Sequence, residues 1–148
     1  MDNNFSIIIS TCDKFSDLWD AHVQLLNQNW ADRNVETFLL TDKPTDRKFK
    51  NITVVAAGEG TEITERLQTV MPMIKTEYVL FTLDDYFLTE KISTEAIKED
   101  ISIMEKQRID YLRLFVMTRK SLKNRKAKEV EPGIFVLDNN AGDYIVSL

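Results

Sequence analysis

Several residue types that mark particular classes of protein are scarce in this chain of 148 residues. It contains one cysteine, one histidine, 4 Gly and 3 Pro. A single cysteine cannot form an internal disulfide, and this little glycine and proline excludes a collagen-like or mucin-like chain. Because 43% of the residues are hydrophobic and 29% are charged, the chain can fill a core and is not a wholly disordered protein.

Long apolar runs are lacking as well. The apolar runs present, such as residues 7–9 and 78–81, fall far short of the roughly 20 consecutive apolar residues that cross a membrane. Residues 1–4 carry no positive charge ahead of the first apolar stretch, so we expect no secretory signal. The free cysteine suits a reducing compartment, and we therefore expect a protein of the cytoplasm.

Charge is distributed unevenly along the chain. The formal net charge is −5, which argues against a nucleic acid as the partner. Residues 118–128 contain six basic and no acidic residues, so that the other residues carry 19 − 6 = 13 basic against 24 acidic side chains. We interpret residues 118–131 as a solvated basic loop. There are two alternatives. The segment could be a lid that closes on a bound diphosphate, or a surface that contacts the anionic inner face of the membrane.

Hydrophobic periodicity predicts alternating strands and helices. Short runs rich in β-branched residues predict strands at residues 5–10, 35–41, 52–55, 77–83 and 110–116, and a C-terminal hairpin of 134–137 with 144–148. A 3.6-residue period predicts helices at residues 16–30, 61–75 and 94–107, capped by Ser16, Thr61 and Ser93. This order predicts one α/β domain over residues 1–148, a three-layer sandwich with a mostly parallel, Rossmann-like sheet.

The apolar faces of the first two helices give the expected core. They comprise Trp19, Val23, Leu26 and Trp30 in the first helix and Ile63, Leu67, Val70 and Ile74 in the second. Pro72 should break the last turn of the second helix. His22 lies beside the first apolar face and is interpreted as a packing residue, with catalysis as the alternative. Base stacking is the alternative for Trp19 and Trp30.

Polar side chains follow three of the predicted parallel strands. They are Thr11, Cys12 and Asp13 after the first strand, Thr41 and Asp42 after the second, and Asp84 and Asp85 after the fourth. In open α/β sheets, ligands bind beyond these carboxyl ends. Two adjacent carboxylates repel each other, and a divalent cation, Mn²⁺ or Mg²⁺, would offset their charge together with a phosphate. The alternative is that the pair only ends the strand and solvates a loop.

The residues after this acidic pair, Tyr86, Phe87 and Leu88, are apolar. We expect them to pack back into the protein and hold the carboxylates in place. No Gly-x-x-x-x-Gly-Lys-Ser/Thr and no Gly-x-Gly-x-x-Gly motif is present, which counts against a P-loop nucleotidase and a dinucleotide dehydrogenase. A receiver-like domain is also disfavoured, because its acidic pair would follow the first strand.

Residues 77–88, Glu-Tyr-Val-Leu-Phe-Thr-Leu-Asp-Asp-Tyr-Phe-Leu, resemble the metal-binding segment of nucleotide-sugar glycosyltransferases of the GT-A fold. Within that family, the segment resembles bacterial enzymes that build capsular or surface polysaccharides. Weaker agreement comes from residues 10–14 with Trp19, from Thr41 with Asp42, and from residues 109–114. The resemblance covers residues 5–116.

The resemblance implies a role for each matching position. Asp85 would coordinate the divalent cation, while Asp84 would share the metal or contact the donor ribose. The other donor-binding residues implied are Thr11, Asp13, Asp42 and Arg66. Many relatives have Asp-x-Asp where this chain has Asp-Asp, so both carboxylates stay candidates for the metal.

The resemblance also implies a saccharide or lipid-linked acceptor and a carboxylate base. No base is assigned here, and the acidic residues Asp138 and Asp143 are interpreted as turn formers. Cys12 is not assigned as a nucleophile. We expect the chain to be a donor-binding portion that lacks its acceptor half. The alternative is a nucleotide-binding module without catalysis.

Overall fold

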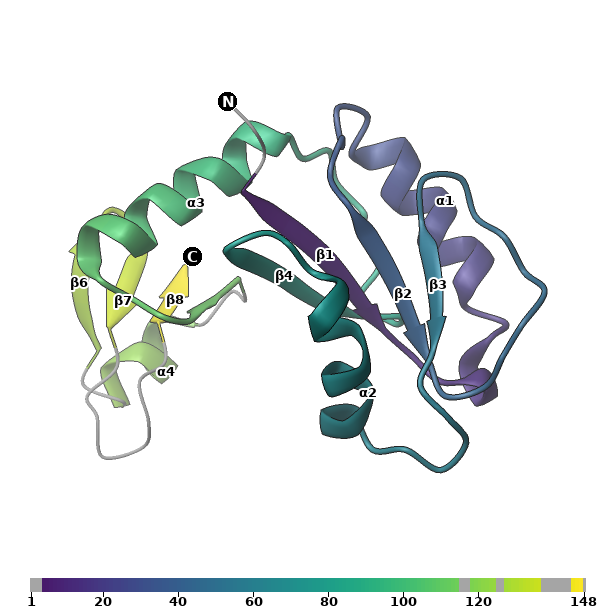
Figure 1. The fold of residues 1–148 in the computed structure, drawn as a ribbon. Coiled ribbons are helices and arrows are strands. Elements are labelled where there is room, and N and C mark those ends of the chain that lie inside the picture. The colour runs from purple at the N-terminus through teal and green to yellow at the C-terminus, as the bar shows by residue number, and fades with distance from the viewer. Residues whose placement is uncertain (1–3, 115–117, 125–126, 137–144, 148) are drawn as a thin grey trace. The chain divides into compact units, whose positions relative to one another are not determined.

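The computed structural model describes residues 4–114, 118–124, 127–136 and 145–147 (Figure 1). The chain divides into two compact units, Met1–Thr94 and Glu95–Leu148, and each is described by itself. That residues 1–148 act as a single nucleotide-sugar-binding domain stays a prediction.

The first unit is built on a parallel sheet. Its strands are β1 (Phe5–Ser10), β2 (Thr37–Thr41), β3 (Thr53–Ala56) and β4 (Tyr78–Leu83), in the order β3-β2-β1-β4. Every residue of β1 and β2 is buried. Strands covered on both faces need continuous apolar runs rather than alternating ones, which is why the sequence predicts these two strands so closely.

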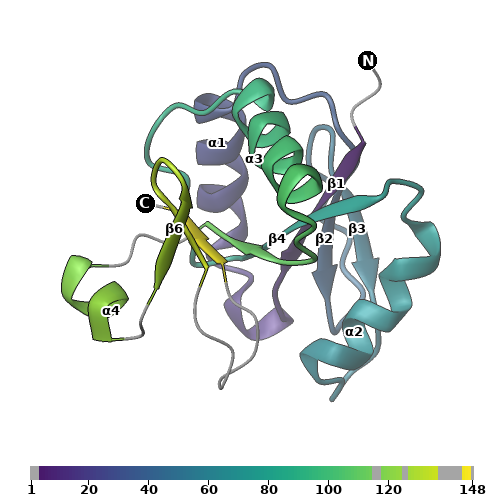
Figure 2. The same cartoon turned by 90° about the vertical axis from the view of Figure 1, so that its left-hand side faces the viewer.

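Helices cover both faces of this sheet. The first unit contains α1 (Trp19–Asn29) and α2 (Ile63–Val70), with the 3₁₀ turns η1 (Asp13–Phe15) and η2 (Met71–Met73). Side chains alternate along β1, and Phe5 stacks on Trp30 at the end of α1 with 6.2 Å between ring centroids. Ile8 points the other way and clusters with Val70 of α2. Figure 2 shows α1 and α2 on opposite sides of the sheet, a Rossmann-like α/β layout.

The caps of the two helices differ from those expected. Ser16 ends η1, and α1 begins only at Trp19. The N-cap of α2 is Glu62, which forms a capping box with Glu65. The Thr61 hydroxyl donates to the carbonyl oxygen of Gly58 at 2.7 Å. Thr61 is thus committed to the preceding glycine turn, and Glu62 takes the cap position instead.

The expected cores of the helices are largely confirmed. Trp19, Val23, Leu26 and Trp30 are buried, as is Val70, and the partly buried Leu67 and Ile74 pack against the Val70 cluster. The expectation for Ile63 is wrong, because its side chain is 44% exposed. It lies in the first turn of α2, where residues 62–65 all face solvent. Pro72 falls in η2, so the expected break of the helix is confirmed.

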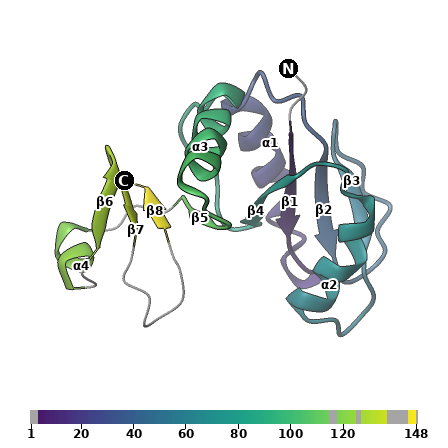
Figure 3. The same cartoon turned by 60° about the vertical axis from the view of Figure 1, so that its left-hand side comes forward.

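The second unit has a smaller mixed sheet. Its elements are α3 (Thr94–Gln107), β5 (Leu112–Arg113), α4 (Arg119–Asn124), β6 (Lys128–Glu131), β7 (Ile134–Val136) and β8 (Ile145–Ser147). The strand order is β5-β8-β7-β6 (Figure 3). β7 pairs antiparallel with β8, which confirms the predicted hairpin, and β8 pairs parallel with β5. The turn residues Asp138 and Asp143 lie outside the described residues.

The basic segment at residues 118–131 is not a simple loop. It contains α4 and β6, visible in Figure 2, although residues 125–126 lie outside the described part. Leu122 is buried and packs against Ala127 and Phe135. Lysine and arginine are good helix formers, and Leu122 gives α4 a buried apolar contact.

Among the described residues, no helix has the length and apolar character that crossing a membrane requires.

The core of the first unit can be tested by a matched pair of substitutions. Ile8→Ala should destabilise the protein by about 2–5 kcal/mol because Ile8 is fully buried. Ile63→Ala should cost less than about 0.5 kcal/mol because the side chain is exposed. Chemical denaturation followed by tryptophan fluorescence measures both, since Trp19 and Trp30 both lie in this unit. Equal losses for the two variants would contradict this core.

Candidate functional site

The strand order creates a topological switch point at the carboxyl edge of the parallel sheet. From β1 the chain proceeds through β2 to β3 on one side, and it then returns to β4 on the other side of β1. The segments that follow β1 and β4 therefore lead away in opposite directions, which is where open α/β sheets bind ligands. Ser10 is paired with Leu83, so the two strands end level with each other. Thr11 and Asp84 come next in each chain segment.

A buried hydrogen-bond chain joins these two strand ends. The Thr11 hydroxyl donates to Oδ2 of Asp84 and accepts from Nε1 of Trp19 at 2.7 Å. All three side chains are buried. Because buried polar groups are costly unless they are paired, this chain fixes the Asp84 carboxylate toward the inside of the protein.

The backbone of Asp84 is held as firmly as its side chain. Its N–H donates to the carbonyl oxygen of Ser10 at 3.3 Å. Its own carbonyl oxygen lies 3.0 Å from Nδ1 of His22 on α1. Asp84 is thus fixed at its N–H, its carbonyl and its carboxylate.

Asp85 differs sharply from its neighbour because it is exposed. The Tyr86 N–H donates to the carbonyl oxygen of Leu83 at 3.1 Å and closes a turn over the acidic pair, Asp84 and Asp85. A carboxylate that is presented outward from a fixed turn can meet a ligand without reorganising the protein.

The aromatic residues after the acidic pair do not pack as predicted. Tyr86 is 58% exposed and Phe87 is 37% exposed, although the Phe87 ring lies 6.1 Å from that of His22. The segment is held by polar contacts instead, such as the bond from Nδ2 of Asn29 to the carbonyl oxygen of Leu88 at 2.6 Å. The turn at the acidic pair directs Tyr86 toward solvent, and hydrogen bonds to α1 replace the expected apolar packing.

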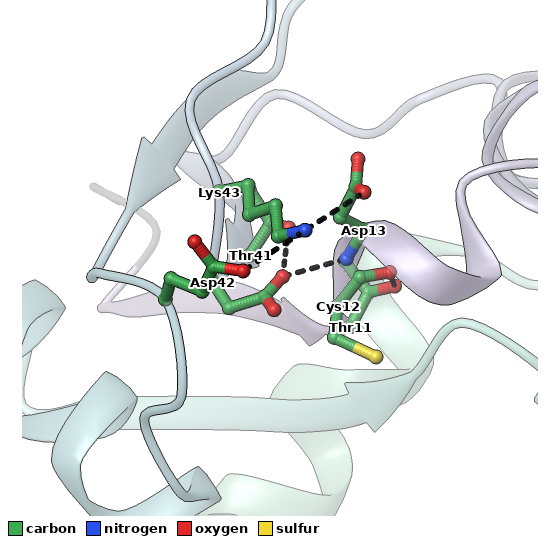
Figure 4. Close-up of polar contacts among 7 residues, drawn as sticks. Thr11, Cys12, Asp13, Thr41, Asp42 and Lys43 are labelled. Carbon is green, nitrogen blue, oxygen red and sulfur yellow. Dashed lines mark hydrogen bonds and ion pairs between the residues drawn. The ribbon is translucent and has the colours of Figure 1, made fainter.

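Asp13 and Asp42 form a second cluster at the same edge. The Asp13 N–H donates to Oδ1 of Asp42 at 2.6 Å, and the Thr41 hydroxyl donates to the same oxygen at 3.3 Å (Figure 4). Burial raises the pKa of the Asp42 carboxyl. Hydrogen bonds from backbone N–H groups and from Thr41 outweigh burial and leave the pKa below its ordinary value.

Lys43 belongs to this cluster and was not predicted. Its ammonium lies 3.2 Å from Oε1 of Glu59 and 3.8 Å from Oδ2 of Asp13. The hydrogen bond and charge of Glu59, together with the charge of Asp13, raise the pKa of Lys43. Its position directly after Asp42 at a strand end was the only signal in the sequence.

Arg66 shares no hydrogen bond with either of these clusters among the described residues. Its Nη1 donates to the carbonyl oxygen of Thr61 at 2.5 Å. Its Nε is buried and has no hydrogen-bond partner among the described residues. The structure therefore uses Arg66 to hold the turn before α2, and its contact with a donor stays a prediction.

The carboxylates present fit a divalent cation that takes part of its coordination from a ligand. No group of three histidine, cysteine, aspartate or glutamate side chains is arranged around a metal position in the described part of the chain. Mg²⁺ commonly uses one or two carboxylates, together with water and substrate phosphates. Asp85, with Asp84 beside it, matches that smaller set of ligands.

No model of a protein family matches this chain, and no curated protein or solved structure matches it significantly. The site therefore rests on its own geometry.

The buried chain through Thr11 makes a direct prediction. Thr11→Val keeps the shape of the side chain but leaves Trp19 Nε1 and the Asp84 carboxylate without their partner, so it should lower the free energy of unfolding by about 3 kcal/mol. Thr11→Ser keeps the hydroxyl and should cost clearly less. Chemical denaturation of both variants checks this, and equal costs would refute the role of the hydroxyl.

The lowered pKa of Asp42 gives a prediction about pH. A carboxyl with a lowered pKa in the folded protein stabilises the fold above its unfolded pKa and loses this contribution as pH falls through the folded pKa. Wild type should therefore exceed Asp42→Asn in stability at neutral pH, and the gap should close below the ordinary value of 3.8. Denaturation from neutral to acidic pH measures the gap, with Asp46→Asn in the same exposed loop as the control. A gap that does not depend on pH would contradict the prediction.

Proposed function

We propose that this chain is the nucleotide-sugar-binding domain of a glycosyltransferase of the GT-A type, acting in the cytoplasm in polysaccharide synthesis. The observation that carries the proposal is the acidic pair at the switch point, with Asp84 fixed inward and Asp85 presented outward. The resemblance of residues 77–88 to the metal-binding segment of that family supports the same assignment.

Asp85 would hold Mn²⁺ or Mg²⁺, with Asp84 as the supporting carboxylate. A bound cation of this kind supplies charge that stabilises a nucleoside diphosphate as it leaves the sugar. The geometry favours Asp85 as the principal ligand because Thr11 already occupies one oxygen of Asp84.

Asp42 and its neighbours suit the nucleoside part of the donor. An ionised carboxylate accepts hydrogen bonds from ribose hydroxyls, and a carboxyl whose pKa lies below the ordinary value of 3.8, such as that of Asp42, is ionised at neutral pH. Asp13 and Thr11 precede α1 at the same edge and would lie beside the nucleotide. A saccharide or lipid-linked acceptor completes the proposed reaction, for which no base is assigned.

A nucleotide-binding module without catalysis is the second candidate. This candidate needs only the metal and nucleotide contacts described above and no catalytic base. Both candidates predict metal-dependent nucleotide binding, and only the enzyme turns over a donor.

Metal-dependent binding provides the test. Calorimetric titration with UDP, GDP, CDP and ADP should show binding by at least one of them that strengthens with Mn²⁺. Asp85→Ala should weaken that binding about tenfold or more, because it removes the exposed carboxylate. Glu90→Ala, which removes an exposed carboxylate from the same segment, is the matched control and should bind like wild type.

The outcomes separate the two candidates. Hydrolysis of the matching nucleotide-sugar by a protein that binds the nucleotide would support the enzyme, whereas binding without hydrolysis would favour the module. Absence of binding, or equal binding by wild type and Asp85→Ala, would overturn the assigned site.

A further inference from the structure

His22 is buried directly against the acidic pair, and the proposed function does not use it. It is the only imidazole in the chain and is 3% exposed. Nδ1 lies 3.0 Å from the main-chain carbonyl oxygen of Asp84, and the ring lies beside Phe87. Nε2 is buried and has no hydrogen-bond partner among the described residues.

These contacts determine the tautomer of the ring. A carbonyl oxygen can only accept, so Nδ1 must carry the proton of the bond. Burial lowers the pKa of His22, against the hydrogen bond to the Asp84 carbonyl and the nearby charges of Asp84 and Asp85, and Nε2 has no partner among the described residues in either charge state. A neutral imidazole has one N–H, which leaves Nε2 as a bare acceptor inside the protein.

An orphaned acceptor makes His22 a poor choice for stability alone. A buried polar atom without a partner costs about 1–3 kcal/mol, and an apolar side chain would avoid that cost. What an apolar side chain could not provide is the hydrogen bond to Asp84. The residue is therefore explained by the bond that Nδ1 makes.

That bond controls the position of Asp85. The Asp84 carbonyl belongs to the peptide unit that links Asp84 to Asp85, and this unit is planar. A hydrogen bond to the carbonyl oxygen restrains this plane and hence the point from which Asp85 leaves the backbone. The carboxylate of Asp84 is fixed separately by Thr11.

We propose that His22 is a positioning residue, whose Nδ1–H holds the peptide between Asp84 and Asp85 so that Asp85 faces the ligand. The metal-binding consequence rests on the proposed function, whereas the tautomer and the geometry of the turn do not. Partners that orient metal ligands in this way typically change metal affinity by about 10–100-fold when they are removed.

Two substitutions test the two ring nitrogens of His22 separately. The side-chain amide nitrogen of asparagine can take the place of Nδ1, so His22→Asn keeps the donor to Asp84. The amide nitrogen of glutamine corresponds to Nε2, so His22→Gln loses the donor at Nδ1. Folding of both variants is checked by tryptophan fluorescence and thermal unfolding.

The decisive measurement on wild type is the nitrogen NMR spectrum of the ring. Because the chain has one histidine, its ring signals are unambiguous. We expect the neutral tautomer with the proton on Nδ1. The tautomer with the proton on Nε2 would overturn the proposal whether or not any variant folds.

The variants test the consequence for the site. His22→Gln should speed hydrogen exchange of the Tyr86 amide, which bonds to Leu83 across the turn, about tenfold, and His22→Asn should not. For the nucleotide that wild type binds best with Mn²⁺, His22→Gln should raise Kd about tenfold, and His22→Asn should leave it within about twofold.

Failure of this proposal can be distinguished from failure of the proposed function. If wild type binds no nucleotide with Mn²⁺, the proposed function is wrong, and the ring tautomer and Tyr86 exchange still decide the role of His22. If wild type binds and both variants retain its affinity and its Tyr86 exchange, the proposed role of His22 is wrong and the metal site stands.

Discussion

The buried hydrogen bonds from Trp19 to Thr11 and from Thr11 to Asp84 are the constraint on which the rest of the site depends. They connect a helix, the end of β1 and the end of β4 through buried groups. Losing any of them would leave a polar group buried and unpaired, so the connection is close to all-or-none. It also places two adjacent carboxylates in different environments, because the Asp84 side chain is buried against Thr11 while Asp85 is exposed.

Helix α1 does more than cover the sheet, since polar groups along it hold the segment that follows β4. Asn29 donates to Leu88 and accepts from the N–H of Ile92, and Nε1 of Trp30 donates to Thr94 at 3.0 Å. Hydrogen bonds fix where a backbone runs without covering its side chains. This explains how Tyr86 and Phe87 can be exposed on a segment whose backbone is firmly held.

Some acidic side chains at the carboxyl edge of the sheet have hydrogen bonds or ion pairs that stabilise their negative charge, and others do not. Asp42 is stabilised by the Asp13 N–H and by Thr41, and Lys43 offsets the charges of Asp13 and Glu59. Asp85 has no ion pair of this kind among the described residues. A bound cation would therefore act where the protein has not placed a positive charge, which agrees with the proposed role of the acidic pair. The nucleoside would then contact the cluster of Asp13, Asp42 and Lys43, where the negative charges are already compensated.

The sequence by itself determined the parallel strands, the buried tryptophan face of α1 and the gathering of acidic residues at one edge, because these follow from local apolar patterns and strand order. It did not determine that Glu62 rather than Thr61 caps α2, or that the basic segment forms α4, since those outcomes depend on the Gly58 turn and on the packing of Leu122. Only the tertiary structure decided that Asp84 is buried while Asp85 is exposed, and that His22 contacts the Asp84 carbonyl. Thr11 and Asp84 lie 73 residues apart, and His22 and Asp84 lie 62 apart. No local pattern records such a pairing, because it arises only when the folded sheet and α1 bring the partners together away from water.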